Sequence, residues 1–190
     1  MKIPFFILSV FLPLLSAASK HDSPQDLLRS SCVHASYPGL CLRTLSSYSG
    51  PTNTPRDLAR AAVKVSLTRA RKASSYLTSA SVTGKSKRER AALSDCVEQV
   101  ADSVDELSRT LGELKRLRGE TFEFQMSNAQ TWASAALTSE DTCLDGFERV
   151  DGKVKSDVKK MLMNVAKVTS NALYMINRLN ESHDRHQLNP

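Results

Sequence analysis

The sequence of 190 residues has few of the groups from which active sites are built. It contains only seven glycines, and they form neither the GxGxxG nor the GxxxxGK pattern of a phosphate-binding loop. Three of its four histidines, His21, His183 and His186, lie close to the ends of the chain, and the fourth is His34. Since an enzyme needs a convergent acid, base, nucleophile or cofactor loop, we expect this protein not to be an enzyme and to need no cofactor.

Metal and nucleic-acid partners are also not expected. The four cysteines form no CxxC pair and no histidine cluster accompanies them, so the sequence offers no zinc site. Aromatic residues make up 6% of the chain, and the 26 Lys and Arg are mixed with 20 Asp and Glu rather than interleaved with stacking rings. The net charge of +6 indicates either a solvated basic surface or loose attraction to an anionic polymer.

The only long apolar run lies at the N-terminus. After Lys2, the segment Ile3 to Leu15 is almost wholly apolar, and residues 16–18 are small, as a cleavage site requires. We interpret residues 1–18 as a secretory signal peptide, because the run is shorter than the ~20 residues of a membrane-spanning helix. The mature chain, residues 19–190, is then expected to be exported and soluble.

Four cysteines in an exported chain predict two disulfides. Sequence alone permits three pairings. Cys32 and Cys41 enclose a short Tyr37-Pro38-Gly39 turn, which favours a local bridge and leaves Cys96 for Cys143. In the chain-entropy view, these closures are worth roughly 3 and 4 kcal/mol, so the longer bridge should contribute more.

Apolar residues recur at steps of three and four, and no strand-like alternation of any length is present. Two short arms, 26–35 and 38–48, predict a helical hairpin over residues 26–48. Four longer helices are expected between residues 55 and 180. We therefore predict an all-α protein, an up-down-up-down four-helix bundle preceded by a small disulfide-closed N-terminal helical hairpin.

Each long helix has one stripe that we expect to be buried in the bundle. The rest of the first long helix is strongly basic, and we interpret it as a solvated face. The stripes consist of Ala59, Val63, Ser66, Ala70, Ala73 and Leu77; Leu93, Val97, Val100, Val104, Leu107, Leu111 and Leu114; Phe122, Met126, Ala129, Ala133 and Ala136; and Val154, Val158, Met161, Val165, Val168, Ala172, Met175 and Leu179.

The third long helix is predicted to be interrupted. Thr138 and Ser139 can each cap a new helical turn, in which Glu140 and Asp141 occupy positions that favour carboxylates. Cys143 follows one turn later. We expect a kinked helix here, joined through this cysteine to a neighbouring helix.

Four segments carry a family resemblance. They are CVHASYPGLC with Cys32 and Cys41, ALSDCVEQVADSVDEL around Cys96, TWASAALTSEDTCLDGF around Cys143, and SNALYMINRL near the end. With these segments the chain resembles the plant inhibitor family that includes pectin methylesterase inhibitors and invertase inhibitors. The third segment is more similar to the methylesterase-inhibitor branch and to the pro-regions of methylesterases. No catalytic domain follows residue 190, so we expect a free-standing inhibitor.

The resemblance implies a protein partner, pectin methylesterase, bound one to one in the cell wall or apoplast. An inhibitor of cell-wall or vacuolar invertase is the alternative, and a basic wall protein that only binds pectin is a third interpretation. Weak electrostatic binding to pectin would follow from the net charge. In the family, positions on the second long helix and around the third-helix cysteine contact the target enzyme, and in this chain they are Glu98, Gln99, Asp102, Asp105, Thr142 and Asp145.

Taken alone, Glu98, Asp102 and Asp105 form an acidic ridge opposite the apolar stripe, for which a solvated face is the default interpretation. Against an acidic enzyme cleft, such a ridge would need to gain a proton, so binding should weaken as pH rises. The chain departs from the family pattern at two positions: it has Gln99 and Val100 where the pattern of pectin methylesterase inhibitors has Asn followed by Tyr. Gln99 keeps the side-chain amide, whereas Val100 lacks the aromatic ring. We expect this difference to affect the strength of inhibition rather than its mode.

The C-terminal region contains one modification signal. Asn180, Glu181 and Ser182 form an N-glycosylation sequon. Residues 181–190 are polar, and we expect this tail to be frayed.

Overall fold

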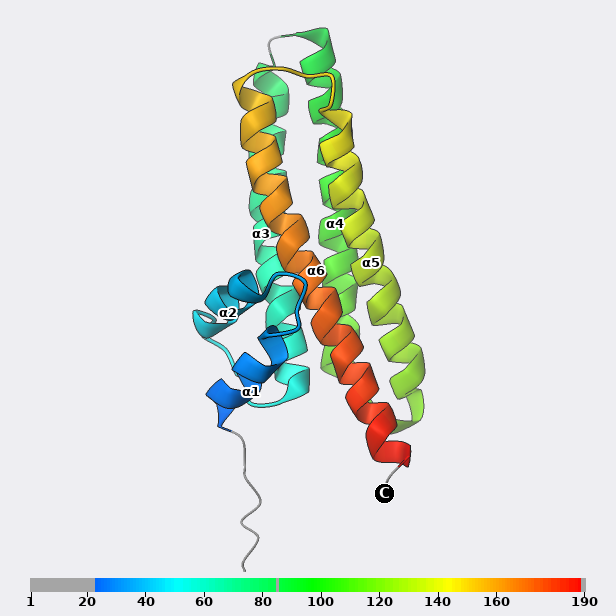
Figure 1. Ribbon diagram of the computed structural model, residues 1–190. Helices are drawn as coiled ribbons and strands as arrows, with labels where there is room; N and C mark the ends of the chain where they lie inside the picture. The colour runs from blue at the N-terminus through cyan, green and yellow to red at the C-terminus, as the bar shows by residue number, and fades with distance from the viewer. Residues whose placement is uncertain (1–22, 85, 189–190) are drawn as a thin grey trace, which may run out of the picture.

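The computed structural model describes residues 23–84 and 86–188, which fold into a long helical bundle with a small helical hairpin beside its lower half (Figure 1). The four bundle helices are α3 (Pro55–Thr83), α4 (Lys87–Arg116), α5 (Phe122–Gly146) and α6 (Lys153–Leu188). They alternate in direction, so the predicted all-α, up-down-up-down bundle is confirmed. The predicted signal peptide, residues 1–18, lies outside the described residues. None of the described helices is long and apolar enough to cross a membrane.

The N-terminal hairpin consists of α1 (Pro24–Cys32) and α2 (Pro38–Ser46). Ser23 caps α1 by accepting a hydrogen bond from the Asp26 amide at 3.2 Å, which is why α1 begins before the predicted residue 26. A disulfide joins Cys32 to Cys41, both buried, and holds the two short helices together.

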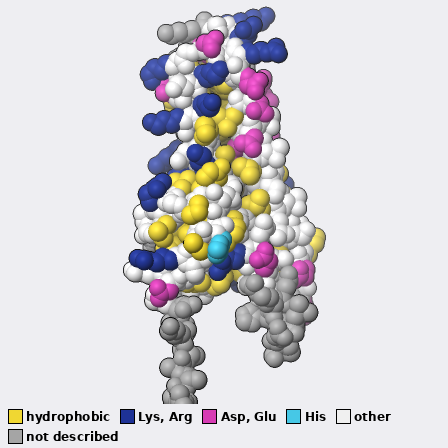
Figure 2. All heavy atoms as spheres, viewed as in Figure 1, with side chains coloured by type: hydrophobic (Ala, Val, Ile, Leu, Met, Phe, Trp, Pro, Cys, Tyr) yellow, Lys and Arg dark blue, Asp and Glu magenta, His cyan; other side chains and the backbone are white. Residues whose placement is uncertain are grey.

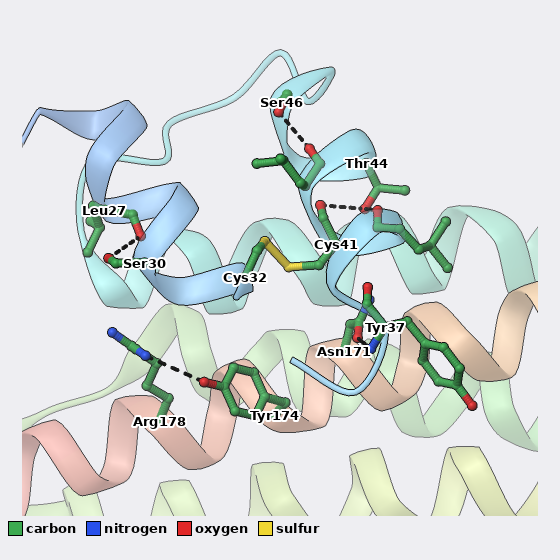
Figure 3. The surroundings of a disulfide bond; sticks show 12 residues. Leu27, Ser30, Cys32, Tyr37, Cys41, Thr44, Ser46, Asn171, Tyr174 and Arg178 are labelled. Carbon is green, nitrogen blue, oxygen red and sulfur yellow. Dashed lines mark hydrogen bonds between the residues drawn. A yellow bond between two sulfur atoms is a disulfide. The ribbon is translucent and has the colours of Figure 1, made fainter. Parts of the chain in front are cut away.

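The hairpin shares the hydrophobic core of the bundle, with α2 packed against α3, and one side chain of α6 adds hydrogen bonds to it. Asn171 of α6 accepts a hydrogen bond from the Tyr37 amide at 2.9 Å and donates one to the Tyr37 carbonyl at 3.1 Å (Figure 3). Asn171 is 4% exposed, so its side chain is buried and these bonds are partly shielded from solvent. The hairpin therefore packs against the bundle and does not project from it.

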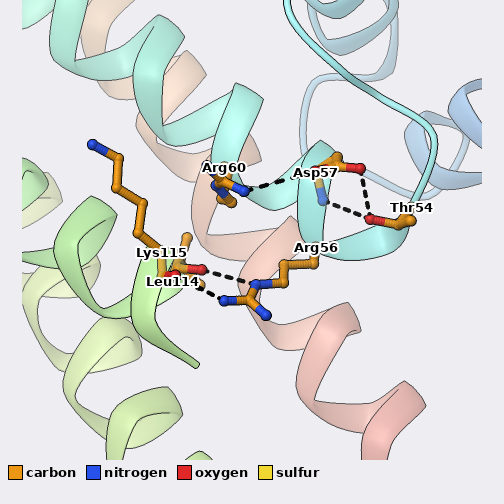
Figure 4. A network of polar contacts seen from close by, with 6 residues as sticks. All are labelled: Thr54, Arg56, Asp57, Arg60, Leu114 and Lys115. Carbon is orange, nitrogen blue, oxygen red and sulfur yellow. Dashed lines mark hydrogen bonds and ion pairs between the residues drawn. The ribbon is translucent and has the colours of Figure 1, made fainter. Parts of the chain in front are cut away.

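The ends of the long helices are satisfied by polar groups. Thr54 and Ser86 cap α3 and α4 by accepting bonds from amides three residues later. Arg56 donates to the Leu114 carbonyl at 3.0 Å and to the Lys115 carbonyl at 2.9 Å, at the C-terminus of α4 (Figure 4). A short 3-10 helix, Gly119–Thr121, follows in the connection from α4 to α5. The Gln125 side chain stabilises this connection by donating a hydrogen bond to the Arg116 carbonyl at 3.1 Å.

The core follows the predicted stripes closely. All six predicted positions of α3 and all five of α5 are buried, and those of α4 and α6 are buried or half-buried. Ala129, Ala133 and Ala136 of α5 are 0% exposed, since small side chains let α4 approach closely. The stripes missed several buried side chains, namely Leu162, Ile176, Ser103, Thr110, Glu140, Thr169 and Asn171.

The predicted interruption of the third long helix is wrong. Helix α5 runs without a break from Phe122 to Gly146. Thr138 does not cap a new turn, because its hydroxyl donates to the Ser134 carbonyl at 3.2 Å, the bond that a threonine inside a helix commonly makes. Glu140, expected in the first turn of a new helix, instead lies in the core with no exposed surface.

The expected fraying after residue 180 is also corrected. Helix α6 continues to Leu188. The ring of His183 stacks on the ring of Phe122 at the start of α5, with centroids 3.7 Å apart. This contact between two distant parts of the sequence gives the last turns of α6 a packing partner, which the polar sequence of the tail did not indicate.

Candidate functional site on helices α4 and α5

An acidic stripe runs along the solvent side of α4. Asp95, Glu98, Asp102 and Asp105 are all exposed, and steps of three and four place them on one side of the helix. From Asp95 to Glu106 the chain has five acidic residues and no Lys or Arg. Helix α5 has four acidic residues and no Lys or Arg. The side of the bundle formed by α4 and α5 is therefore negative.

The second disulfide joins these two helices beneath the stripe. Cys96 of α4 and Cys143 of α5 are bonded, with Cα atoms 4.5 Å apart and side chains 1% and 2% exposed. Above this bridge lies a shallow groove of about 480 Å³, lined by Ala92, Asp95, Cys96, Glu98, Gln99, Thr142, Cys143, Asp145 and Gly146.

Four of the six predicted contact residues meet at this groove. They are Glu98, Gln99, Thr142 and Asp145, and with Asp95 we call them the α4–α5 face. Asp95 was missed by sequence reasoning, although it lies three residues before Glu98 on the same stripe. Because covalently joined helices carry these side chains, the surface is ordered before any partner arrives.

The other two predicted contact residues do not line this groove. Asp102 continues the stripe along α4 and is exposed. Asp105 forms an ion pair with Arg109 at 2.8 Å, and Arg109 also lies 6.0 Å from the ring centroid of Trp132. The charge of Asp105 is thus partly balanced, so it contributes less to the negative surface than Glu98 or Asp102.

The hydroxyl of Thr142 has a fixed orientation. It donates to the Thr138 carbonyl at 2.8 Å, within its own helix. Its proton is therefore already used, and the oxygen can only accept a hydrogen bond from a partner. The groove consequently offers carboxylates, an amide and a hydroxyl acceptor on an open surface, with no pocket that would exclude water from a reaction.

Gln99 and Val100, where the chain departs from the family pattern, face different surroundings. Gln99 is half-buried and lines the groove, so its amide remains within reach of a partner. Val100 is 0% exposed and belongs to the core. The loss of an aromatic ring at this position is therefore a change in internal packing.

A second acidic group lies behind the stripe and was not predicted. Glu106 is half-buried, and burial is the main cause that raises its pKa, followed by the charges of Asp102 and Asp105. A hydrogen bond from Ser139 and the charge of Arg109 act in the opposite direction. Glu106 is thus a carboxyl group behind the stripe that gains a proton more readily than an ordinary glutamate.

Glu140 is the most unusual acid of the protein. It accepts hydrogen bonds at Oε1 from Ser103 of α4 at 2.7 Å and Thr169 of α6 at 3.0 Å. Its Oε2 is buried without a hydrogen-bond partner in the described part of the chain. Burial raises the pKa of Glu140 to about 7, against the effect of the two hydroxyl donors, with small further contributions from Asp141 and Glu106.

Asn180, the predicted glycosylation position, lies within α6 and is half-buried. Its modification stays a prediction. Among the side chains that the structure describes, no group of three or more His, Cys, Asp and Glu is placed to hold a metal ion.

Comparison with known proteins agrees with this architecture. Residues 26–175 match the family described as plant invertase/pectin methylesterase inhibitor. The chain is 54% identical over 197 residues to Pectinesterase inhibitor 3 of Arabidopsis thaliana, covering 96% of each protein. It is 41% identical over 184 residues to the 21 kDa protein of Daucus carota, covering 93% of this chain and 95% of that protein.

A solved structure is similar as well. It is a mutant form of a pectin methylesterase inhibitor from Arabidopsis, which matches with a TM-score of 0.68 over 82% of this chain and 97% of that one. The sequence identity between them is 22%, so this likeness shows the fold.

Proposed function

Since the chain belongs to the plant invertase/pectin methylesterase inhibitor family, we propose that it inhibits pectin methylesterase by covering the enzyme's pectin-binding cleft with the α4–α5 face. The target is supported by the name of the relative that shares 54% of its residues over 96% of the chain. The surface is supported by one observation, the groove above the Cys96–Cys143 bridge that gathers four of the six nominated residues.

Occlusion by a rigid surface fits this geometry. The face is open, so it can lie against another protein, and it is held by two long helices and a disulfide, so little ordering is needed on association. Its carboxylates would meet a cleft that binds a polymer. Where they meet acidic groups of the enzyme, one carboxyl must take up a proton, and the half-buried Glu106 behind the stripe, whose pKa is already raised, is a candidate for it.

The setting of this activity is also part of the proposal. The predicted signal peptide and the two disulfides favour an oxidising extracellular compartment, the apoplast or cell wall. One bundle would bind one enzyme molecule. Weak attraction to pectin itself would come from the net charge of +6, or +5 once Lys2 is removed with the leader.

The test is an inhibition assay with the mature chain, residues 19–190, refolded with both disulfides intact. A plant pectin methylesterase and a plant acid invertase are assayed side by side at mildly acidic pH. Stoichiometric loss of methylesterase activity with invertase unaffected is the expected result. Inhibition of invertase alone would transfer the protein to the other branch of the family, and inhibition of neither would overturn the proposal.

The contact surface is tested by a matched pair of charge reversals on α5. Asp145→Lys places a cation in the groove, and we expect inhibition roughly tenfold weaker, about 1.4 kcal/mol of binding free energy. Glu123→Lys makes the same charge change at an exposed position near the other end of α5 and should leave inhibition unaltered. Equal effects of the two variants would show that only net charge matters and would remove the α4–α5 face from the mechanism.

A further inference from the structure

The side of the bundle opposite the α4–α5 face is basic. Helix α3 carries six Lys or Arg and one Asp, and α6 carries seven Lys or Arg and three Asp or Glu. Figure 2 shows the basic side chains gathered along the α3 side of the molecule, while acidic side chains lie toward α5. The excess of cations is thus concentrated on one pair of helices.

A groove of about 550 Å³ opens on this basic side, between α3 and the end of α2 with the residues that follow it. Four cationic side chains line it, and no acidic side chain does. Hydroxyl groups and one aromatic ring complete the wall. The polar and aromatic members are Thr44, Ser47, Tyr48, Ser49, Lys64, Thr68, Arg69, Arg71 and Lys72.

A second groove, of about 610 Å³, adjoins the first because both are lined by Arg69 and Lys72. It leads across α3 to α6, where it adds Lys160. Its one carboxylate, Asp157, is bonded to Lys153 at 2.6 Å. The two grooves together form an elongated cationic track, which we call the α3 track.

Arg69 lies where the two grooves meet. Burial is the main cause that lowers the pKa of Arg69, and the charge of Arg43 adds to it. Its guanidinium donates to the Asn164 amide oxygen at 2.5 Å, and within the described residues no carboxylate lies at ion-pair distance from it. Cations held together in this way repel one another, and a bound polyanion would relieve the repulsion.

The chemistry of the track favours an acidic carbohydrate. Lys64 lies 5.8 Å from the ring centroid of Tyr48, so an aromatic surface, a cation and several hydroxyl groups are close together. Nucleic acid would require successive aromatic faces for base stacking, whereas Tyr48 is the only ring of the track. Hydroxyls and cations can instead bind the hydroxyl and carboxylate groups of a uronic acid polymer.

We propose that the α3 track binds a segment of de-esterified galacturonan, the anionic product that a pectin methylesterase leaves behind. The choice of galacturonan as the uronic acid polymer rests on the proposed function, because a pectin methylesterase produces de-esterified galacturonan. The track and the α4–α5 face lie on different helix pairs. One molecule could therefore be held on the product polymer while it covers an enzyme.

The test is a calorimetric titration of the disulfide-intact mature chain with de-esterified galacturonan oligomers. Fully methyl-esterified oligomers of the same length and inorganic polyphosphate serve as comparison ligands. We expect the acidic oligomer to bind with an affinity that falls as salt rises, and the esterified oligomer not to bind. Binding of the esterified oligomer with equal affinity, or of polyphosphate in preference to the acidic oligomer, would overturn the proposal.

The site is located with two matched double variants. Arg71→Gln with Lys72→Gln removes two exposed cations from the track, and we expect affinity to fall roughly two- to thirtyfold, as two exposed ionic contacts would give. Lys87→Gln with Arg88→Gln removes the same two residue types at the exposed start of α4 and should change affinity little. An equal loss in both variants would mean diffuse attraction to net charge and would refute a site.

The methylesterase assay keeps this inference separate from the proposed function. With a soluble esterified substrate, the variant carrying Arg71→Gln and Lys72→Gln should inhibit the methylesterase as strongly as the unaltered chain does, since it leaves the α4–α5 face intact. If the unaltered chain inhibits the enzyme without preferring the acidic oligomer, the inference is wrong and the proposed function stands. If it binds the acidic oligomer at the track and inhibits nothing, the inference stands and the proposed function is wrong.

Discussion

Glu140→Gln is expected to change the pH dependence of stability. Glu140 is fully buried between α4, α5 and α6, where it faces Ser103 and Glu106 of α4, Asp141 of its own helix, and Thr169 of α6. No cation is among the groups that shift its pKa. The charged form of Glu140 is therefore disfavoured in the folded protein, and the neutral amide of Gln avoids this cost.

The magnitude follows from the shift in pKa. The pKa of Glu140 is raised from 4.5 to about 7 in the folded chain, so between these pH values the folded protein keeps a proton that the unfolded chain releases. The free energy of unfolding must then fall as pH rises through this window and stay level above it. A shift of this size corresponds to about 3 kcal/mol, or roughly 6–12 °C in Tm for a chain of this length.

The assay is urea or thermal unfolding, followed by circular dichroism from acidic to mildly alkaline pH. Near pH 4.5 the variant and the unaltered chain should have similar stability, because both side chains are neutral there. Above about pH 7 the variant should be more stable by up to about 3 kcal/mol. The difference between the two curves isolates this residue from Glu106, whose raised pKa adds a slope of the same sign to both.

Glu123→Gln provides the control, since it makes the same substitution at an exposed position of α5. Its stability should follow the unaltered chain at every pH. Parallel curves for Glu140→Gln and the unaltered chain would refute the reasoning. They would mean that Glu140 is ionised in the core at no cost, with the same pKa in the folded protein as in the unfolded chain.

Two further predictions concern the bridge and the inhibition. Replacing Cys96 and Cys143 by Ala should lower the free energy of unfolding by about 4 kcal/mol and weaken inhibition. Replacing Cys32 and Cys41 by Ala should lower the free energy of unfolding by about 3 kcal/mol. This second variant should still inhibit at temperatures where it is folded. Chemical denaturation and the methylesterase assay measure both effects, and equal inhibition by the two variants would show that the bridge does not organise the α4–α5 face. Inhibition should also weaken as pH rises from mildly acidic to neutral, because binding of the acidic stripe takes up a proton; an inhibition constant that does not vary with pH would contradict this.

The periodic positions of the sequence predicted the bundle well because burial in a helix depends on a repeat that is local in the chain. Ala59, Val63 and Ala70, or Ala129 and Ala133, are found in the core where that repeat puts them. The stripe that contains Glu98 was likewise predicted to be exposed, and it is. Local spacing is enough for such residues.

The errors arose where a residue's partner is far away in the sequence. Glu140 next to Thr138 and Ser139 has the pattern of a helix start, and only Ser103 and Thr169 on other helices make its burial tolerable. Asn171 has no local reason to be buried, since its partner is the backbone of Tyr37. The four groove residues could be nominated one by one, but their meeting above a disulfide depends on how two helices pack.

The separation of charge between the two helix pairs gives the bundle a transverse electric dipole. Helices α3 and α6 form its positive side, and α4 and α5 form its negative side. Near an anionic gel such a molecule experiences a torque as well as an attraction, which turns α3 and α6 toward the gel and leaves α4 and α5 pointing away from it. A protein of modest net charge can in this way reach an anionic surface already oriented, with α4 and α5 and their disulfide facing the solvent, where they are accessible to another protein.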